Sequence, residues 1–136
     1  MSSEMNNNSQ RINLSSGAYW EDIVGYSRLV RIGNFIEVAG TAAVDGEGNI
    51  IGKGSFYEQT KFILQKIENA LHQVNASIKD VVRTRIYVTD ITKWQDVGKA
   101  HGEFFKNIKP VTSIVEVQNL IHPDLWVEIE ITAVLQ

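Results

Sequence analysis

Cysteine is absent from the 136 residues of this chain. Its absence excludes disulfide bonds, a thiolate nucleophile and every metal site that depends on cysteine ligands. A chain without cysteine fits a reducing compartment, and we expect a cytoplasmic protein. Long hydrophobic runs are absent too. None approaches the roughly 20 residues that a helix needs to cross a bilayer, so we expect no membrane partner.

An excess of basic residues is also missing. Lysine and arginine number 13 against 16 aspartate and glutamate residues, which gives a net charge of −3 at pH 7. Without an overall basic field the chain is poorly suited to hold an anionic polymer, and we expect no nucleic-acid partner. The hydrophobic content of 43% and the charged content of 21% are those of an ordinary globular protein.

Length and the distribution of polar residues predict a single domain. Residues 1–10 are rich in serine and asparagine and have no hydrophobic segment of the kind found in signal peptides. We expect them to form a disordered polar tail. A chain of this size can bury one core, so residues 11–136 are expected to form one domain.

Alternation of hydrophobic and polar residues predicts five strands. Residues 26–32 and 35–40 are rich in hydrophobic residues and are joined by Gly33 and Asn34, which is typical of a β-hairpin with a primed turn. The other segments with a period of two are residues 81–88, 109–117 and 126–134.

Two helices are predicted from capping signals that precede hydrophobic residues at spacings of three and four. Residues 55–58 form a capping box for a helix that extends to about residue 75. Residues 92–95 form a second capping box, for a helix that extends to about residue 106. The side of this second helix that is expected to face inward comprises Val97, His101, Phe104 and Phe105.

The expected order, β-β-α-β-α-β-β, predicts an α+β fold in which both helices pack on one face of a mixed sheet. The residues expected to face the helices are Val82, Thr84, Ile86, Val88, Val127, Ile129, Ile131 and Ala133. The residues expected on the helix-free face are Arg83, Arg85, Tyr87, Trp126, Glu128 and Glu130. Arginines, carboxylates and aromatic rings together favour a polar subunit interface, with a simple solvated face as the alternative.

Several short motifs occur in a fixed order along nearly the whole expected domain. They are Gly25-Tyr26, Gly33-Asn34 with residues 35–40, residues 80–82 with 87–90, Glu103-Phe104-Phe105, residues 110–117 and residues 127–130. This set, spanning residues 23 to 134, resembles the RidA family, also called YjgF/YER057c/UK114.

The resemblance implies a chorismate-mutase-like homotrimer. Its helix-free sheet faces would point inward, and small-molecule sites would lie in the clefts between subunits. The implied reaction is hydrolysis of reactive enamines or imines to 2-keto acids and ammonia, and no cofactor is expected. In the family, an arginine on the strand after the proline binds the substrate carboxylate, a glutamate on the last strand orients water and a tyrosine lines the cleft.

The family's site residues carry over to this chain in part. Tyr26, Gly40 and Glu128 stand at the tyrosine, glycine and glutamate positions, and Ile114 is also expected to bind ligand. Thr112 stands where the family has its arginine and is expected to line the cleft and bind ligand, but a hydroxyl cannot supply the charged, bidentate contact of a guanidinium. We therefore expect a protein that is not a standard 2-imino-acid deaminase.

A positive charge at this site could come from Arg28, Arg85 or Lys109, and Arg28 is expected to share a face with Tyr26. Glu128 has two interpretations, which are the orientation of water and an ion pair with an arginine across the interface. Two classes of function remain. One is a trimeric hydrolase of an imine, enamine or related small molecule that lacks a carboxylate, and the other is a non-catalytic trimer that binds a small molecule or a partner.

No metal site is predicted. Residues 45–49 are similar to the start of a calcium-binding loop, but Ile50 and Phe56 occupy the positions of its glycine and glutamate, so a turn is expected. The three histidines are far apart in the sequence and lack the spacing of metal ligands.

Overall fold

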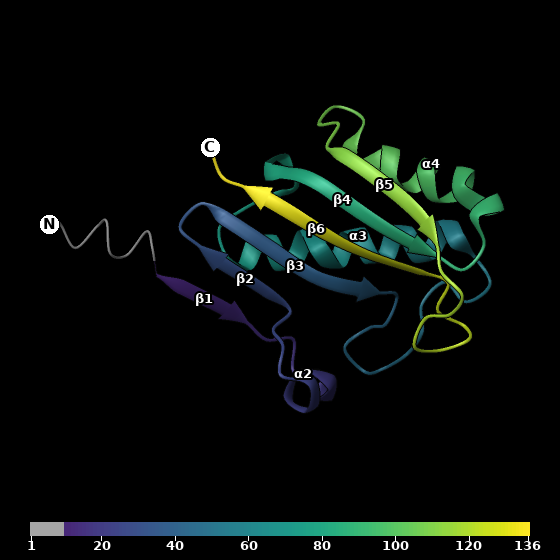
Figure 1. The fold of residues 1–136 in the computed structure, drawn as a ribbon, viewed down its shortest axis with the longest axis horizontal. Coiled ribbons are helices and arrows are strands. Elements are labelled where there is room, and N and C mark those ends of the chain that lie inside the picture. The colour runs from purple at the N-terminus through teal and green to yellow at the C-terminus, as the bar shows by residue number, and fades with distance from the viewer. Residues whose placement is uncertain (1–9) are drawn as a thin grey trace, which may run out of the picture.

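A mixed β-sheet forms the centre of the structure, a computed structural model that describes residues 10–136. Residues 1–9, and with them nearly all of the expected disordered tail, lie outside the described residues. The strands are β1 (Arg11–Leu14), β2 (Leu29–Ile32), β3 (Phe35–Ala42), β4 (Val81–Val88), β5 (Val111–Glu116) and β6 (Val127–Val134). They form a six-stranded sheet in the order β1-β2-β3-β6-β4-β5 (Figure 1). Only β4 and β5 pair in parallel.

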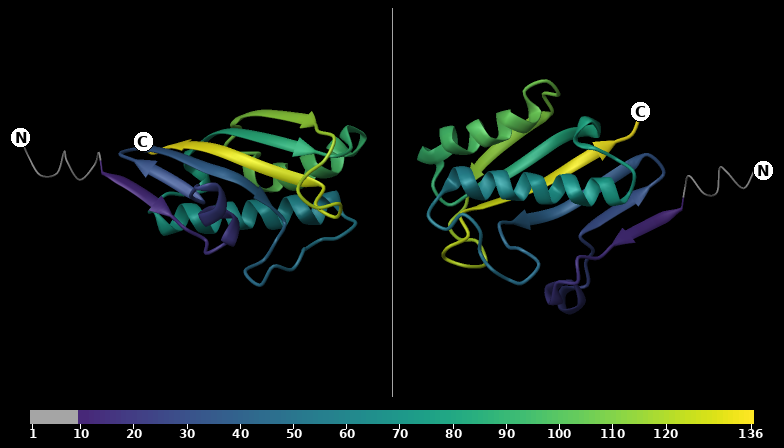
Figure 2. Two further views of the ribbon diagram at one scale, coloured as in Figure 1. Left: turned by 60° about the horizontal axis from the view of Figure 1, so that its bottom comes forward. Right: turned by 180° about the vertical axis from the view of Figure 1, so that it is seen from behind.

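Two long helices, α3 (Phe56–Gln73) and α4 (Trp94–Phe105), cover the same face of this sheet (Figure 2). The short helix α2 (Tyr19–Val24) connects β1 to β2, and 3₁₀ turns occupy Ile78–Asp80 and Ile91–Lys93. The predicted α+β class, with both helices on one face of a mixed sheet, is confirmed. None of the helices in residues 10–136 combines the length and the apolar character needed to span a bilayer.

β1 and α2 are absent from the sequence prediction, which places the first strand at residues 26–32. The structure corrects this, because β2 begins only at Leu29 and β1 precedes it. β1 has four mostly exposed residues, and its hydrophobic face consists of only Ile12 and Leu14. It is a strand because it pairs with β2, with Leu14 opposite Leu29, and its alternation over four residues is too short to predict a strand by itself.

The predicted hairpin between β2 and β3 is confirmed. Ile32 pairs with Phe35 across a two-residue turn, and Gly33 has a φ of 58°. Asn34 does not share this positive φ, which makes the turn type II′, the primed turn that requires glycine at its first position.

The core lies between the sheet and α3. Ser55 caps this helix as predicted, since its side chain accepts a hydrogen bond of 3.0 Å from the backbone N–H of Glu58. The fully buried side chains at this contact include Ile63, Leu64, Ile67 and Leu71 of α3 and Ile129 and Ile131 of β6. Burial of each such side chain contributes roughly 1.5–3 kcal/mol, so the packing of α3 on the sheet is a large part of the hydrophobic stabilisation.

Two local predictions are wrong. Residues 92–95 do not cap α4. Asp90 instead accepts hydrogen bonds from the backbone and side chain of Thr92, and α4 starts at Trp94 without a side-chain cap. Val82 does not face the helices. A bulge between Val81 and Arg83 shifts the alternation, so that Val81 is 3% and Val82 41% exposed.

Trp126 does not share the helix-free face with Glu128, which corrects a third prediction. Its ring packs against Phe56 at the start of α3, with 4.8 Å between ring centroids, and its Nε1 donates a hydrogen bond to the Pro123 carbonyl. Trp126 precedes the first residue of β6, where alternation along the strand does not yet govern the side-chain direction.

Gln59 is a fully buried polar residue that ties α3 to the segment before β6. Its Nε2 donates to the carbonyl of Asp124 at 2.9 Å, and its Oε1 accepts from the backbone N–H of Trp126 at 2.9 Å. One amide side chain thus satisfies both a donor and an acceptor in a segment without regular structure.

We expect Gln59→Leu to lower the free energy of unfolding by about 2–4 kcal/mol, because it leaves two buried backbone groups without partners. Urea denaturation measures the change. Gln65→Leu on the exposed side of the same helix is the matched control and should change stability by less than about 0.5 kcal/mol. Equal effects of the two substitutions would contradict the role assigned to Gln59.

Candidate functional site

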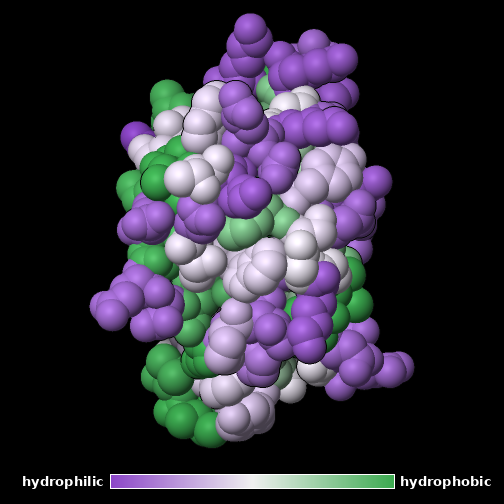
Figure 3. All heavy atoms as spheres, turned by 90° about the vertical axis from the view of Figure 1, so that its right-hand side faces the viewer, coloured by the Kyte–Doolittle hydropathy of each residue, from purple (hydrophilic) through white to green (hydrophobic). Residues whose placement is uncertain are grey.

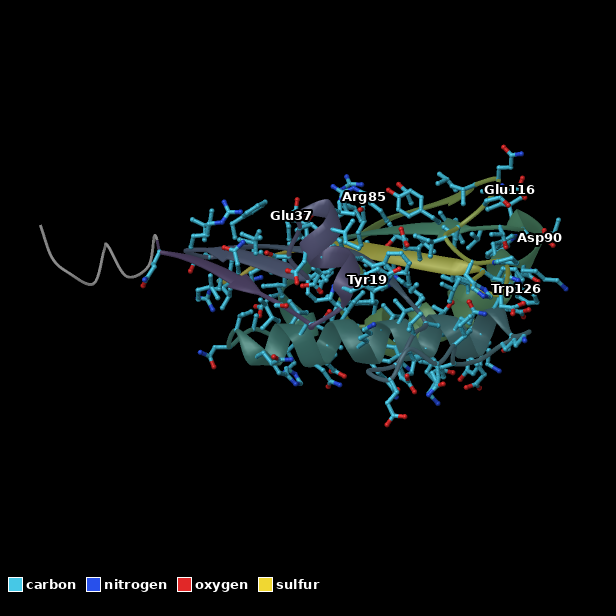
Figure 4. The ribbon with its side chains drawn as sticks, turned by 90° about the horizontal axis from the view of Figure 1, so that it is seen from below. Tyr19, Glu37, Arg85, Asp90, Glu116 and Trp126 are labelled. Atoms are coloured by element: carbon cyan, nitrogen blue, oxygen red, sulfur yellow. The ribbon has the colours of Figure 1, made fainter. Side chains whose placement is uncertain are left out.

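The helix-free face carries a network of charged and hydroxyl groups. The Tyr87 hydroxyl donates to Glu130 Oε1 at 2.8 Å, and Arg85 Nε lies 3.9 Å from the same oxygen. Thr132 donates to Glu37 on the neighbouring strand. Figure 4 shows Glu37 and Arg85 projecting from the sheet on the side opposite α3. Except for Trp126, the predicted polar character of this face is confirmed.

A hollow of about 540 Å³ lies on this face, where β1 and β2 approach β3. Its lining includes Tyr26, Glu37, Arg85 and Glu130. Of the predicted site residues, Tyr26 lines this hollow. A concave surface with few apolar groups and several charged ones suits a small polar ligand better than a hydrophobic one.

Glu128 is not among the residues that line the hollow, and it lies on β6 between Ala42 of β3 and Tyr87 of β4. It is half-buried and makes no hydrogen bond to any residue in the part of the chain that the structure describes. Burial raises the pKa of the Glu128 carboxyl above its ordinary value, and the charge of Arg28 opposes this shift. Arg85 pairs with Glu130, so the structure gives Glu128 no arginine partner on its own sheet.

Gly40 leaves the space that the Glu128 carboxylate occupies. A Cβ atom at position 40 would lie 2.7 Å from Glu128 Oε2, closer than real contacts allow. The register of β3 against β6 also shifts between Val38 and Thr41, so Gly40 lies in a bulge. Two of the predicted site residues, Gly40 and Glu128, are therefore in contact within one chain.

Arg28 joins this pair from the segment before β2. It is only 9% exposed, and its Nη2 donates to the carbonyl of Gly40 at 2.6 Å. Its Nε is buried and has no hydrogen-bond partner. Burial lowers the pKa of the guanidinium, while the charges of Glu21 and Glu128 act in the opposite direction. An unpaired buried donor costs about 1–3 kcal/mol, which makes this arginine costly for stability.

Thr112 and Ile114 lie on β5, separated from β6 by β4, and they face the helices. Thr112 Oγ1 donates to the Pro110 carbonyl at 3.1 Å and lies 2.8 Å from Oγ1 of Thr84. Thr84 in turn lies 3.0 Å from Nε2 of His101 on α4. Ile114 packs against the core. Within one chain these two residues are not brought together with Glu128.

The hydroxyl protons in this chain of contacts have one consistent order. Because Thr112 donates to Pro110, it can only accept from Thr84, which must then accept from Nε2–H of His101. Burial lowers the pKa of His101, in agreement with a neutral ring. The hydroxyl at the family's arginine position is thus engaged in an internal network.

Of the three candidate cations, Arg28 is the one beside Glu128. Arg85 belongs to the Glu130 network, and Lys109 precedes β5 with a φ of 56°. The sequence argument missed Glu21, a buried carboxylate on α2 that accepts hydrogen bonds from Ser15 and Ser16. The spacing of five and six residues between the serines and the acid lies outside the common local motifs, so no sequence signal indicated this contact.

Among residues 10–136 no cluster of three or more histidine, aspartate or glutamate side chains could hold a metal ion. The predicted turn at residues 45–49 is confirmed, since Asp45 accepts hydrogen bonds from the backbone N–H groups of Glu47 and Asn49 at 2.9 and 2.8 Å.

The fold and this site define a class of small α+β proteins with a polar, helix-free sheet face. The family model described as Endoribonuclease L-PSP matches residues 18–135. The solved structure of Rv2704 from Mycobacterium tuberculosis, described as a member of the YjgF/YER057c/UK114 family, is 48% identical with a TM-score of 0.84. The similarity covers 93% of this chain and 100% of that chain. This chain belongs to that family, also known as RidA.

Two curated relatives are more distant. Protein SCO2049 of Streptomyces coelicolor is 35% identical over 120 residues, covering 88% of this chain and 89% of that protein. The protein named 3-aminoacrylate deaminase RutC, of Acinetobacter baylyi, is 26% identical over 104 residues, covering 76% of this chain and 82% of that protein. The sequence prediction of the family is confirmed.

We expect Gly40→Ala to displace the Glu128 carboxylate toward solvent while changing stability by less than about 1 kcal/mol, because the crowded atom ends a flexible side chain. The pKa of Glu128, followed by carbon-13 NMR, should fall toward its ordinary value. Gly46→Ala is the control, since nothing lies within 4 Å of its added Cβ. An unchanged Glu128 pKa in Gly40→Ala would refute the close approach.

We expect His101 to make the protein less stable in acid. The pKa of its ring is lowered in the folded state, so the unfolded chain binds more protons as the pH falls below the ordinary value of 6.5. The contribution of the neutral His101 ring to the free energy of unfolding is fully present above that pH, and it is lost as the pH falls through the folded-state pKa. Urea denaturation from pH 7.5 to 5 should show a shallower loss in His101→Gln than in the wild type.

His72 is exposed, so His72→Gln is the control for the loss of one imidazole in His101→Gln. An identical pH dependence in the wild type and in His101→Gln would contradict the buried, neutral ring.

Proposed function

We propose that the protein is a homotrimer that hydrolyses a small imine or enamine in clefts between its subunits, with Glu128 orienting the attacking water. The observation that carries the proposal is the Glu128 carboxylate, which is half-buried, free of hydrogen bonds to the described residues and held against Gly40. Its oxygens remain available to accept hydrogen bonds from water.

The chemistry follows from a carboxylate in such a position. Glu128 accepts a proton from water as the water oxygen bonds to the imine carbon, and the proton passes to nitrogen. The hydroxyl of the resulting carbinolamine then gives its proton to nitrogen as the C–N bond breaks, so that a carbonyl forms and ammonia leaves. Partial burial supports this role, because the raised pKa of Glu128 makes it a stronger base than an exposed carboxylate.

The proposed trimer is supported by the exposed hydrophobic residues of the edge strand β5. Val111 is 57% and Val115 46% exposed, on a strand with one free edge in the described sheet. In Figure 3, which views the molecule from the right of Figure 1, hydrophobic residues gather along the left margin, the side of the helix-free face. A chorismate-mutase-like arrangement would cover this surface and bring β5 of one subunit to Glu128 of the next.

The substrate is proposed to differ from that of a standard 2-imino-acid deaminase. Thr112 carries no charge, and its hydroxyl is already engaged by Thr84 and Pro110. The relative named 3-aminoacrylate deaminase supports deamination as the reaction class. Because the Thr112 hydroxyl is already hydrogen-bonded within the chain, it also favours a second candidate function, which is a trimer that binds a small molecule without catalysis.

We expect the wild type to release little ammonia from 2-aminoacrylate, generated in situ, and to act on other members of a panel of small imines and enamines. On any panel substrate, Glu128→Gln should lower kcat/KM by about 10²–10⁴-fold. Glu130→Gln is the matched control on the same strand, where the carboxylate is already engaged by Tyr87. Light scattering should give a mass three times that of the 15.3 kDa chain.

Three outcomes would contradict the proposal. Ammonia release that survives Glu128→Gln removes the assigned role, and a monomer at micromolar concentration removes the inter-subunit cleft. Binding of panel compounds without any ammonia release would favour the non-catalytic candidate.

A further inference from the structure

The guanidinium of Arg28 is buried where a ligand has little access. The side chain is 9% exposed, and it lines neither the hollow beside Tyr26 nor a second one of about 590 Å³ beside Trp126. Its Nη2 donates to the Gly40 carbonyl, and its Nε is buried without a hydrogen-bond partner. Burying a guanidinium in this way costs stability, so its place in the fold calls for a functional explanation.

Gly40 connects this buried cation to the candidate catalytic carboxylate. Arg28 Nη2 lies 2.6 Å from the Gly40 carbonyl oxygen, and a Cβ at position 40 would lie 2.7 Å from Glu128 Oε2. The backbone N–H of Ala39 also donates to the Arg28 carbonyl at 3.0 Å. Main chain and side chain of Arg28 thus both hold the bulge of β3 that lies against Glu128.

The charged groups around Glu128 differ in their effect on its carboxyl. Burial raises the pKa of Glu128, the charge of Arg28 opposes this rise, and the charge of Glu130 on the same strand adds to it. On the neighbouring strands, Tyr87 of β4 gives its hydroxyl to Glu130, and the paired residue of β3 is the uncharged Ala42. The ionised form of Glu128 therefore depends on the charge of Arg28.

The charge of Arg28 is not neutralised by an ion pair. Burial lowers the pKa of the guanidinium, and the acidic groups of Tyr26, Glu21 and Glu128 act in the opposite direction. Glu21 accepts its hydrogen bonds from two serines, and no carboxylate of residues 10–136 lies within 4.0 Å of the guanidinium. Lys66 is a neighbouring cation, since burial lowers the pKa of Lys66 and the charge of Arg28 adds to this effect.

We propose that Arg28 is a positioning residue for Glu128. Its buried charge keeps the Glu128 carboxylate ionised, and its hydrogen bond to Gly40 holds the bulge of β3 against that carboxylate. The inference rests on the proposed function, in which Glu128 accepts a proton from the attacking water. A carboxylate can do this only when it is ionised, and a half-buried carboxylate without a nearby cation is protonated over a wider range of pH.

Titration of the Glu128 carboxyl in the intact protein, followed by carbon-13 NMR, tests the proposal. We expect the midpoint to move to higher pH in Arg28→Gln, because the opposing charge is lost, and to stay near the wild-type midpoint in Arg28→Lys, which keeps the charge. Arg31→Gln is the matched control and should leave the midpoint in place, since Arg31 also donates to backbone carbonyls but binds Gly33 and Val74.

A purely structural role of Arg28 predicts the opposite direction. If the side chain only held the bulge, its loss would expose Glu128 and move the midpoint to lower pH, toward that of an ordinary carboxyl. An unchanged or lower midpoint in Arg28→Gln, or an equal rise in Arg28→Lys, would overturn the proposal.

A measurement on the wild type keeps the test decisive if Arg28→Gln does not fold. The Nε signal of Arg28 in nitrogen-15 NMR, assigned through its side-chain carbons, should follow the titration of Glu128 with the same midpoint, and this step should be absent in Glu128→Gln. A wild-type signal without that step overturns the proposal. Ammonia release that survives Glu128→Gln would remove the proposed function, whereas an unmoved Glu128 midpoint in Arg28→Gln would remove only the role of Arg28.

Discussion

β6 is the strand on which the rest of the structure depends, because it pairs with β3 on one side and β4 on the other. Val127, Ile129, Ile131 and Ala133 are fully buried against the helices, while Glu128 and the residues that alternate with it face away. A strand with period-two alternation has one register that buries its hydrophobic face. The same constraint that builds the core therefore holds Glu128 on the helix-free face.

The polar groups on either side of the sheet have different roles. On the helix side, the buried Thr84 hydroxyl links His101 to Thr112 and is satisfied inside the chain. On the helix-free side, Glu130 is engaged by Tyr87, whereas Glu128 is free of hydrogen bonds to described residues and Arg28 is only partly satisfied. Groups that a protein buries without partners cost stability, so each of them calls for an explanation.

Much of the fold could be predicted because strong periodic patterns leave few alternatives. The hairpin at Gly33, the cap at Ser55 and the two faces of β6 followed from local residues. Predictions failed where position in space overrides local pattern. β1 is a strand because it pairs with β2, and a bulge in β4 turns Val82 outward. Trp126 precedes β6, and its ring packs against Phe56 instead of lying on the helix-free face. The family resemblance supplied Tyr26, Gly40 and Glu128, but left open which of three cations replaces the arginine.

The sequence by itself determined the α+β class, the family and the loss of the arginine at position 112, because these depend on residue identity and on patterns along the chain. Only the tertiary structure decided that Arg28, rather than Arg85 or Lys109, lies beside Glu128. The reason is the bulge in β3, which brings the Gly40 carbonyl to Arg28 and the Gly40 Cα to the carboxylate of Glu128. The spacing of Arg28, Gly40 and Glu128 along the chain does not predict that these three residues lie together.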